Sequence, residues 1–305
     1  MKLGIVDLGT NSLRFDIYSI SKHKKPTLLY HEKDMIRLGE EVWITKKLSP
    51  KAIHKTLKRL KIIQTLSQKY KVDQMICHGT SPLREAKNAQ KLLAKIKKTT
   101  GFHFQPLSGK KEALLIAKAM THFHPTPQKT ILIDIGGGST EISMAHKEKI
   151  VFAKSVALGS MRLQHQFLKK IPPTGQAIEH LKNHIQKTLK ILRTARDDSQ
   201  IPYKAIGSAG TIKALAKVAG HSQTELKTKD LEQFLHKIRQ LKLQSLRRLL
   251  KTEGRRGDIL FAGTLLLLEI MRFFHLQSIK VTKKGLRDGI LLDFIQKYAK
   301  KHLLR

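Results

Sequence analysis

Two short turns built from small residues are the parts of this sequence best suited to phosphate chemistry. Each follows an apolar run that ends at an aspartate, Asp7 in the first case and Asp134 in the second. Backbone N–H groups without bulky side chains can converge on phosphate oxygens, so such turns form anion sites. One glycine-rich turn is a weak signal, but two in separate halves of the chain favour a phosphate chain held from both sides. The phosphate-binding candidates are Gly9, Thr10, Asn11 and Ser12 in the first turn, and Gly136, Gly137, Gly138, Ser139 and Thr140 in the second.

Three acidic residues lie in or beside these turns, namely Asp7, Asp134 and Glu141. Alone, their carboxylates would repel phosphate. They fit well as inner-sphere or outer-sphere ligands of Mg²⁺, which prefers carboxylate, water and phosphate oxygens. The sequence therefore predicts a Mg²⁺ cofactor.

Cations occupy the first turns of two predicted helices: Arg84 follows Ser81-Pro82, and Lys110 and Lys111 follow Ser108. A cation there opposes the helix dipole at about 0.3–1 kcal/mol, and a bound anion would reverse that penalty. The alternative is a solvated basic residue in a protein rich in them, and the sequence does not choose between the two.

Glu112 is the lone acid in the segment SGKKEALLIAKAM (108–120). It can be a favourable glutamate in the first turn of a helix. It can equally be a base that the neighbouring lysines keep ionised and that orients a water.

The elements around these residues repeat along the chain. An apolar strand over 3–7, a turn and an alternating strand over 13–20 open the sequence, and the same pattern returns at 131–144. In this alignment Asp7 matches Asp134, and two turn residues match in the same way, Gly9 with Gly136 and Ser12 with Ser139. Repetition at this distance favours a duplicated α/β unit, and the later alternation of strands and helices supports that class.

The proline-rich segment 122–129 is the predicted hinge between two domains. We expect a first domain over 1–122 and a second over 123–287. The C-terminal helix, 288–305, is predicted to pack back on the first domain.

The composition of the chain limits the kinds of partner and the cell compartment that we expect. The chain has 305 residues, 59 Lys and Arg against 23 Asp and Glu, and a formal net charge of +36. Such a charge speeds the capture of anions. The single cysteine excludes an internal disulfide. The most apolar stretch, 259–268, is about half a membrane span, and the first residues lack a secretory pattern. We therefore expect a cytoplasmic protein.

With these motifs, the chain resembles the exopolyphosphatase/guanosine pentaphosphate phosphatase family of the actin–sugar kinase–Hsp70 superfamily. The matching segments are GIVDLGTNS (4–12), GTSPLREAKN (79–88), LSGKKEA (107–113), IDIGGGSTEIS (133–143), LGSMRL (158–163), GSAGTIKALA (207–216), RRGDILFAG (255–263) and KKGLRDG (283–289). The resemblance implies an α/β fold of two duplicated ribonuclease-H-like, or actin-like ATPase, domains. Each has a mixed sheet flanked by helices, with a cleft between the domains. Because the chain ends where longer members add a metal-phosphohydrolase-like domain, it resembles the short, two-domain type.

The resemblance also implies roles for particular residues. Glu112 would be the catalytic base, and Glu141 would assist it or, with Asp134, support the metal. Further phosphate contacts would come from Arg84, Gly210 and Arg256. The chain departs from the family in having Lys111 where a glutamate is usual and Ala209 where serine or threonine is common.

The favoured function is a Mg²⁺-dependent exopolyphosphatase that removes the terminal phosphate of inorganic polyphosphate. The first alternative is a guanosine pentaphosphate 5′-phosphatase, which shares every motif. A non-catalytic polyanion or nucleic-acid binding protein is the alternative from another class, and a sugar or acetate kinase is a third. We expect a homodimer with no specific nucleic acid partner and no membrane partner.

Overall fold

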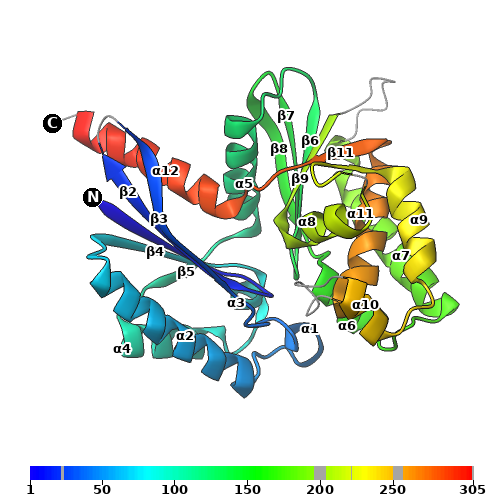
Figure 1. The fold of residues 1–305 in the computed structure, drawn as a ribbon, viewed down its shortest axis with the longest axis horizontal. Coiled ribbons are helices and arrows are strands. Elements are labelled where there is room, and N and C mark those ends of the chain that lie inside the picture. The colour runs from blue at the N-terminus through cyan, green and yellow to red at the C-terminus, as the bar shows by residue number, and fades with distance from the viewer. Residues whose placement is uncertain (22–23, 196–203, 221, 250–256, 304–305) are drawn as a thin grey trace. The chain divides into compact units, whose positions relative to one another are not determined.

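The computed structural model describes residues 1–21, 24–195, 204–220, 222–249 and 257–303. The chain divides into two compact units, Met1–Ser108 and Gly109–Arg305 (Figure 1). Each unit is built on its own sheet.

Unit 1 contains a five-stranded mixed sheet in the order β3-β2-β1-β4-β5. The first three strands pair antiparallel, whereas β4 and β5 run parallel to β1. The strands are β1 (Lys2–Leu8), β2 (Leu13–Ser21), β3 (Lys24–Asp34), β4 (Gln74–Gly79) and β5 (Phe104–Pro106). Strand β1 is buried almost throughout, which agrees with the apolar run predicted there.

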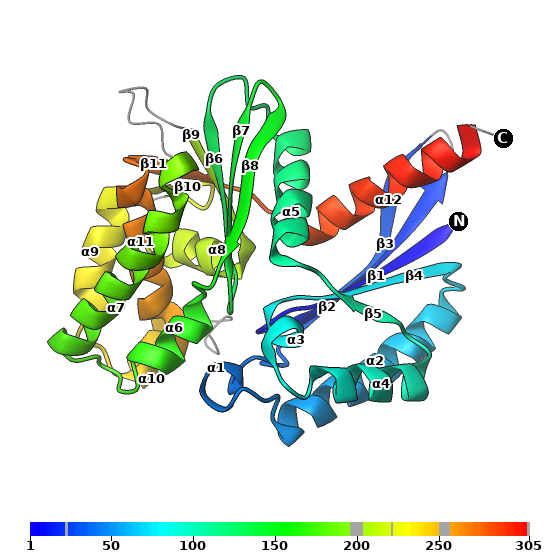
Figure 2. The same ribbon diagram turned by 180° about the vertical axis from the view of Figure 1, so that it is seen from behind.

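The helices of unit 1 are α1 (Val42–Thr45), α2 (Pro50–Lys69), α3 (Ser81–Glu85) and α4 (Ala89–Thr100). As predicted, α2 starts at Ser49-Pro50: the Ser49 side chain accepts a hydrogen bond from Ala52 N, and the proline occupies the first helical position. Helices α2 and α4 pack together along one face of the sheet (Figure 2). Their apolar stripes supply the buried contacts to that face.

Unit 2 contains a six-stranded sheet in the order β10-β11-β9-β6-β7-β8. Strands β6, β7 and β8 pair antiparallel, β9 runs parallel to β6, and β11 runs parallel to β9. The strands are β6 (Thr130–Ile135), β7 (Thr140–His146), β8 (Lys149–Val156), β9 (Lys204–Ser208), β10 (Glu225–Lys227) and β11 (Ser278–Val281).

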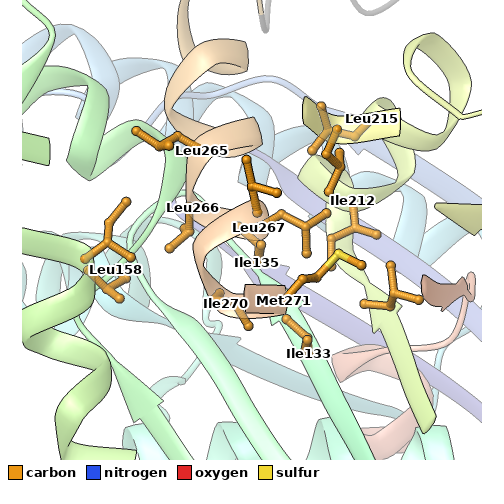
Figure 3. Close-up of a cluster of buried hydrophobic side chains, with 14 of the residues drawn as sticks. Ile133, Ile135, Leu158, Ile212, Leu215, Leu265, Leu266, Leu267, Ile270 and Met271 are labelled. Atoms are coloured by element: carbon orange, nitrogen blue, oxygen red, sulfur yellow. The ribbon is translucent and has the colours of Figure 1, made fainter. Parts of the chain in front are cut away.

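The helices of unit 2 enclose a large apolar core. Helix α11 is buried along almost its whole length, and Figure 3 shows its leucines among side chains of β6 and α8. The helices are α5 (Gly109–Phe123), α6 (Ser160–Phe167), α7 (Gly175–Leu189), α8 (Ala209–Val218), α9 (Thr228–Ile238), α10 (Leu243–Leu249), α11 (Leu260–Phe273) and α12 (Leu286–Leu303), with a 3₁₀ turn over Lys190–Ala195. Helix α5 packs on β7 and β8, and α12 packs on α5.

The two sheets share one inner plan. In each, an antiparallel triplet (β1, β2, β3 or β6, β7, β8) continues into parallel strands (β4, β5 or β9, β11). The predicted fold class, a duplicated α/β unit with a mixed sheet and flanking helices, is confirmed. The cleft expected between the domains stays a prediction.

The division into compact units differs from the predicted domain limits. Packing places the boundary between Ser108 and Gly109, so α5 and α12 both belong to unit 2. The reason is that α5 packs on β7 and β8, and α12 packs on α5. At Gly289, a Cβ would lie 1.9 Å from the Leu115 carbonyl oxygen, so the glycine permits this close helix crossing. The return of the last helix to the first domain stays a prediction.

The position of Arg84 within its helix differs from the prediction. Helix α3 has only five residues, and Arg84 lies in its last turn rather than its first. The prediction that Arg84 opposes the helix dipole from the first turn is therefore wrong. Lys110 and Lys111 do lie at the start of α5, as expected.

The single cysteine and the apolar helices can also be compared with what the sequence predicts. The Cys77 side chain is buried in β4, and burial raises the pKa of its thiol to about 12, so it is an inert packing residue. Among the residues described, no helix combines the length and apolarity that crossing a membrane requires.

Candidate active site

The second glycine-rich turn is a tight hairpin between β6 and β7. Gly136 N donates to Ser139 O at 3.0 Å and closes the loop. A Cβ at Gly136 would lie only 3.0 Å from that carbonyl oxygen, so the closure is tight for any residue except glycine.

Three consecutive carbonyl oxygens of this loop accept hydrogen bonds from the start of α6. The bonds are Ser160 N to Gly136 O at 3.1 Å, Met161 N to Gly137 O at 2.9 Å and Arg162 Nε to Gly138 O at 2.6 Å. In a planar trans peptide, the C=O and the following N–H point in opposite directions. The N–H groups of Gly137, Gly138 and Ser139 are therefore directed away from α6. Successive amides on one side of a loop form an anion site.

The charges of two carboxylates in unit 2 act on a third, Glu141. Asp134, near the end of β6, lies directly opposite Glu141 on β7, and Glu112 lies in the first turn of α5. Burial raises the pKa of Glu141 well above its usual range, and the charges of Glu112 and Asp134 raise it further. Hydrogen bonds from Ser155 and Ser139 offset part of this rise. The structure thus brings together acids from three separate motifs.

Close packing of α5 on β8 positions Glu112. A Cβ at Gly109, the first residue of α5, would lie 2.7 Å from Ser155 Cβ, so the glycine permits the approach. The Ser155 hydroxyl donates to Glu141 Oε1 at 2.7 Å. The same serine therefore contacts the start of the Glu112 helix and holds the Glu141 carboxylate.

Asp134 is framed by the loop before α12. A Cβ at Gly285 would lie 3.7 Å from Asp134 Oδ2 and 3.3 Å from Ser208 Oγ. The Ser208 hydroxyl donates to Lys284 O at 2.6 Å, and Asp288 accepts from Gly285 N at 3.0 Å. These bonds fix the loop beside the carboxylate.

The predicted phosphate contact Gly210 lies in the first turn of α8. It follows Ala209, which has a left-handed φ of 70°. The next residue, Thr211, hydrogen-bonds to Ser160 Oγ at 3.1 Å, which ties the start of α8 to the start of α6. Gly210 therefore belongs to the region around the glycine loop.

The first small-residue turn, in unit 1, has the same closure. Gly9 N donates to Ser12 O at 3.0 Å. The Thr10 and Asn11 carbonyls accept backbone hydrogen bonds at 3.0 and 2.9 Å from Gly39 N and Arg37 N, respectively. By the same peptide geometry, the N–H groups of Asn11 and Ser12 are directed away from that segment. A second set of aligned amides results.

Asp7 and Arg84 complete the candidates in unit 1. Asp7 Oδ2 accepts from Arg14 Nη1 at 3.3 Å. Arg84 Nη1 donates to Leu107 O at 2.8 Å, which holds its guanidinium at the end of β5. The last phosphate candidate, Arg256, lies outside the described residues.

The oxygen donors present fit a magnesium ion. Asp7 Oδ1 and Asn11 Oδ1 are buried and have no hydrogen-bond partner among the described residues. In unit 2, burial and then the charges of Glu112 and Asp134 disfavour the ionised form of Glu141, and a cation there would offset both effects. Carboxylate and amide oxygens are hard ligands of the kind Mg²⁺ takes.

Sequence reasoning missed two residues that shape this region. Arg162 lies in the motif LGSMRL, so it was within a segment already singled out. Ser155 gave no signal because strand β8 was not predicted. Thr140, predicted to bind phosphate, is fully buried and its hydroxyl donates to Leu158 O.

The chain matches the model of the Ppx/GppA phosphatase family over residues 17–298. Exopolyphosphatase 1 of Mycobacterium tuberculosis is 24% identical over 301 residues, which cover 96% of this chain and 88% of that protein. A bifunctional 3-dehydroquinate synthase/phosphatase of Fusobacterium nucleatum is 27% identical over 312 residues, with 95% of this chain and 46% of that protein covered.

Solved structures share the fold. A crystal structure of an exopolyphosphatase from Cytophaga hutchinsonii matches with a TM-score of 0.86 and 24% identity, covering 97% of this chain and 98% of that one. A Ppx/GppA family member from Aquifex aeolicus matches with a TM-score of 0.78 and 24% identity, covering 98% of each chain.

The protein therefore belongs to the Ppx/GppA phosphatase family and has the actin-like ATPase fold of its structural relatives. By class it is a hydrolase of phosphoric anhydrides.

Proposed function

We propose that this enzyme is an exopolyphosphatase, which hydrolyses the terminal phosphate of inorganic polyphosphate with a water activated by Glu112. One observation carries the proposal. In unit 2, a loop with three aligned amides joins the strands that hold Asp134 and Glu141, and Glu112 acts electrostatically on Glu141. Anion-binding groups and carboxylates in one region are what phosphoryl transfer to water needs.

The two glutamates have different roles in this proposal. Burial, together with the charges of Glu112 and Asp134, raises the pKa of Glu141, so without a nearby cation this side chain keeps its proton more readily than an ordinary glutamate. Glu112 lies in the first turn of α5, where the N-terminal end of the helix dipole stabilises a negative charge. Glu112 is therefore the base that orients and deprotonates the attacking water, and Glu141 supports it.

The remaining residues hold and neutralise the phosphate chain. The N–H groups of Gly137, Gly138 and Ser139 bind oxygens of the terminal phosphoryl group, with Gly210 nearby. The turn of Gly9 to Ser12 and the Arg84 guanidinium bind further phosphate oxygens. Such a reaction needs little covalent help from the protein, so fixed amides and cations supply most of the catalysis by positioning and charge stabilisation.

The acids predicted as ligands would hold Mg²⁺: Asp134 and Glu141 within unit 2, and Asp7 within unit 1. When bound, the ion would neutralise charge on the phosphate oxygens.

Charge distribution supports a long substrate. Helices α2 and α4 carry no acidic residue, and their outer faces expose lysines along their length. The exposed lysines are Lys51, Lys55, Lys58, Lys61 and Lys69 on α2, and Lys91, Lys95, Lys97 and Lys98 on α4. A surface of this kind attracts a polyanion at long range. The names of the relatives from Mycobacterium tuberculosis and Cytophaga hutchinsonii point to the same substrate.

The deciding experiment measures phosphate release from long-chain polyphosphate and from guanosine pentaphosphate in parallel, with and without Mg²⁺. We expect faster release from polyphosphate and dependence on the metal. Preferential release from guanosine pentaphosphate would move the enzyme to the alternative substrate. Binding of polyphosphate without release of phosphate from either compound would identify a non-catalytic polyanion binder.

Ionic strength tests the contribution of the lysine faces. The Debye length falls from about 10 Å at 0.1 M salt to about 3 Å at 1 M, so long-range attraction is lost. The apparent affinity for long chains should fall more steeply with salt than the affinity for tripolyphosphate. A Lys55→Gln/Lys58→Gln/Lys61→Gln variant should reduce this difference, whereas Lys169→Gln/Lys170→Gln/Lys190→Gln, which removes three exposed lysines from unit 2, should not. Equal salt dependence for both substrates would exclude the role of surface charge.

Two further expectations accompany this proposal. The enzyme is expected in the cytoplasm and as a homodimer. Fractionation of cells and light scattering of the purified protein test them.

A further inference from the structure

A buried arginine lies directly behind the glycine loop of unit 2. Arg162 is only 6% exposed. Its Nε donates to Gly138 O at 2.6 Å, and its backbone N donates to Gly137 O at 2.9 Å. The pKa of His184 is lowered by burial and next by the charge of Arg162, so this cation acts inside unit 2.

The bond to Gly138 O has a consequence on the other side of the same peptide. The carbonyl of Gly138 and the N–H of Ser139 belong to one planar unit and point in opposite directions. A cation that polarises the carbonyl makes the N–H a stronger donor. The charge itself also attracts an anion more strongly when both are shielded from water.

The surrounding backbone keeps Arg162 and the loop in register. A Cβ at Gly159 would lie 2.4 Å from Gly137 O, so α6 starts in direct contact with the loop. Ser160 donates from its backbone to Gly136 O and hydrogen-bonds through its side chain to Thr211. The peptide orientation is therefore fixed before any anion arrives, which is the arrangement that stabilises developing charge best.

We propose that Arg162 is a positioning residue for phosphate binding. It holds the Gly138–Ser139 peptide with its N–H toward the anion and places a positive charge behind the loop without touching the substrate. This proposal depends on the proposed function in one respect: it takes the bound anion to be the terminal phosphate of the substrate. In unit 1, the corresponding loop carbonyls accept hydrogen bonds from the backbone amides of Arg37 and Gly39. A charged side chain bonded to a loop carbonyl therefore distinguishes the loop of unit 2 from that of unit 1.

The test compares Arg162→Gln and Arg162→Lys with Arg272→Gln. Arg272 on α11 donates to Glu269 of the same helix at 2.9 Å and to Glu232 on α9 at 2.7 Å, so its loss disturbs ion pairs of unit 2 without touching the loop. The measurements are KM and kcat for tripolyphosphate, the Kd for inorganic phosphate by calorimetry, and the thermal midpoint of unfolding.

Loss of a buried hydrogen bond from a charged group weakens binding by roughly 10- to 100-fold. We expect Arg162→Gln to raise KM and the phosphate Kd by roughly this factor, at a temperature where every variant is folded. Arg162→Lys, which keeps the charge, should recover part of the affinity. Arg272→Gln should lower the thermal midpoint but leave KM and Kd unchanged.

The outcomes separate this role from a structural one and from the proposed function. If folded Arg162→Gln keeps the wild-type KM and phosphate Kd, or its activity falls only in proportion to the unfolded fraction, the positioning role is wrong. If Arg162→Gln does not fold, Arg162→Lys decides by the same two constants, with an increase of roughly threefold or more expected. If the wild-type enzyme releases no phosphate from any substrate, the proposed function fails, but the phosphate Kd still tests Arg162.

Discussion

The two small-residue loops have nearly the same backbone but opposite electrostatics. Both close with a 3.0 Å bond from the first glycine N to the carbonyl of the serine three residues later. Both connect the first strand of a sheet to an antiparallel partner. The residue facing the aspartate across the strand pair differs: Arg14 faces Asp7, whereas Glu141 faces Asp134.

This one difference changes what each loop can do. In unit 1, Arg14 and Asp7 form an ion pair, so their charges largely cancel beside the loop. In unit 2, Glu141 adds a second acid and the charge of Glu112 acts on it. A duplicated backbone thus supplies two loops with aligned amides, while the acidic side chains that act on one another lie in only one of the two units.

The turns after the neighbouring parallel strands differ as well. In unit 1, β4 leads through Thr80 into Ser81-Pro82, and in unit 2, β9 leads through Ser208 into Ala209-Gly210. Proline suits the first turn of α3. Ala209 instead has a left-handed φ of 70°, a conformation that favours glycine.

The largest expected effect is the loss of the base in unit 2. Glu112→Gln keeps the size of the side chain but removes the basic carboxylate, and general base catalysis contributes about 10²–10⁴-fold. We therefore expect kcat on saturating polyphosphate to fall by that factor, with binding unchanged or tighter because one negative charge is gone. Glutamine is nearly as good a helix former as glutamate, so α5 should persist. Near-wild-type turnover of the folded variant would transfer the role to Glu141.

Removal of Arg14 makes unit 1 resemble unit 2 in charge. Arg14→Gln leaves Asp7 without its cation, so the loop beside it should bind phosphate less well. Like charges about 4 Å apart repel by about 1 kcal/mol in water and by more near a protein surface, so KM for tripolyphosphate should rise by roughly fivefold or more. Arg14→Lys retains the charge and serves as the matched control, with KM near the wild-type value. An unchanged KM for Arg14→Gln would show that neutralising Asp7 does not matter.

Neutralising Glu141 should change how stability depends on pH. Burial, with the charges of Glu112 and Asp134, raises the pKa of Glu141 in the folded state above the ordinary glutamate value. The folded protein therefore holds this proton more tightly than the unfolded chain, and stability is lost as pH rises from the ordinary glutamate pKa toward the raised one. Thermal unfolding between pH 5 and 8 without Mg²⁺ should show this loss in the wild type and a smaller loss in Glu141→Gln.

The size of this effect can be measured at pH 8. Glu141→Gln should have a higher unfolding midpoint than the wild type there, and a difference of about 1 kcal/mol would appear as a shift of about 2–4 °C in a chain of this size class. Glu179→Gln, which removes an exposed acid on α7, is the control and should not change the pH dependence. Mg²⁺ should narrow the gap between wild type and Glu141→Gln, because the ion would stabilise the ionised carboxylate. If the unfolding midpoints of wild type and Glu141→Gln change with pH in the same way, the raised pKa of Glu141 is contradicted.

The smallest expected effect concerns the turn before α8. Ala209→Gly removes the steric penalty of a left-handed residue, about 1–2 kcal/mol, but adds backbone entropy to the unfolded chain. The net gain should be about 0.5–1 kcal/mol in the free energy of unfolding, measured by denaturant titration. Ala214→Gly, in the middle of the same helix, should instead destabilise by at least about 1 kcal/mol. Destabilisation by Ala209→Gly would mean that the alanine methyl contributes packing that outweighs the strain.

Local sequence patterns predicted much of the fold but failed at the edge strand β3 and at helix α3. The buried strand β1 and the capped helix α2 follow from an apolar run and from Ser49-Pro50, both of which act within a few residues. Strand β3 carries lysine, histidine and glutamate in the segment KKPTLLYHEKD, so its sequence lacks an apolar signature. Its conformation depends on pairing with β2, a contact that no local pattern records. Helix α3 ends at Glu85 because Ala86 leaves the helical conformation, which places Arg84 in its last turn rather than its first.

The sequence by itself determined that the protein is duplicated, that each half begins with a loop rich in backbone donors, and which acids accompany those loops. These features are local: they depend on residue types and on spacings of a few positions. Tertiary structure decided that Glu112 acts on Glu141, that Ser155 hydrogen-bonds the latter, and that Arg162 lies behind the second loop. Those relations join segments far apart in the chain through sheet pairing and helix packing at glycines. Burial then sets the pKa of Glu141, and burial depends on every element that excludes water, so it exists only in the folded protein.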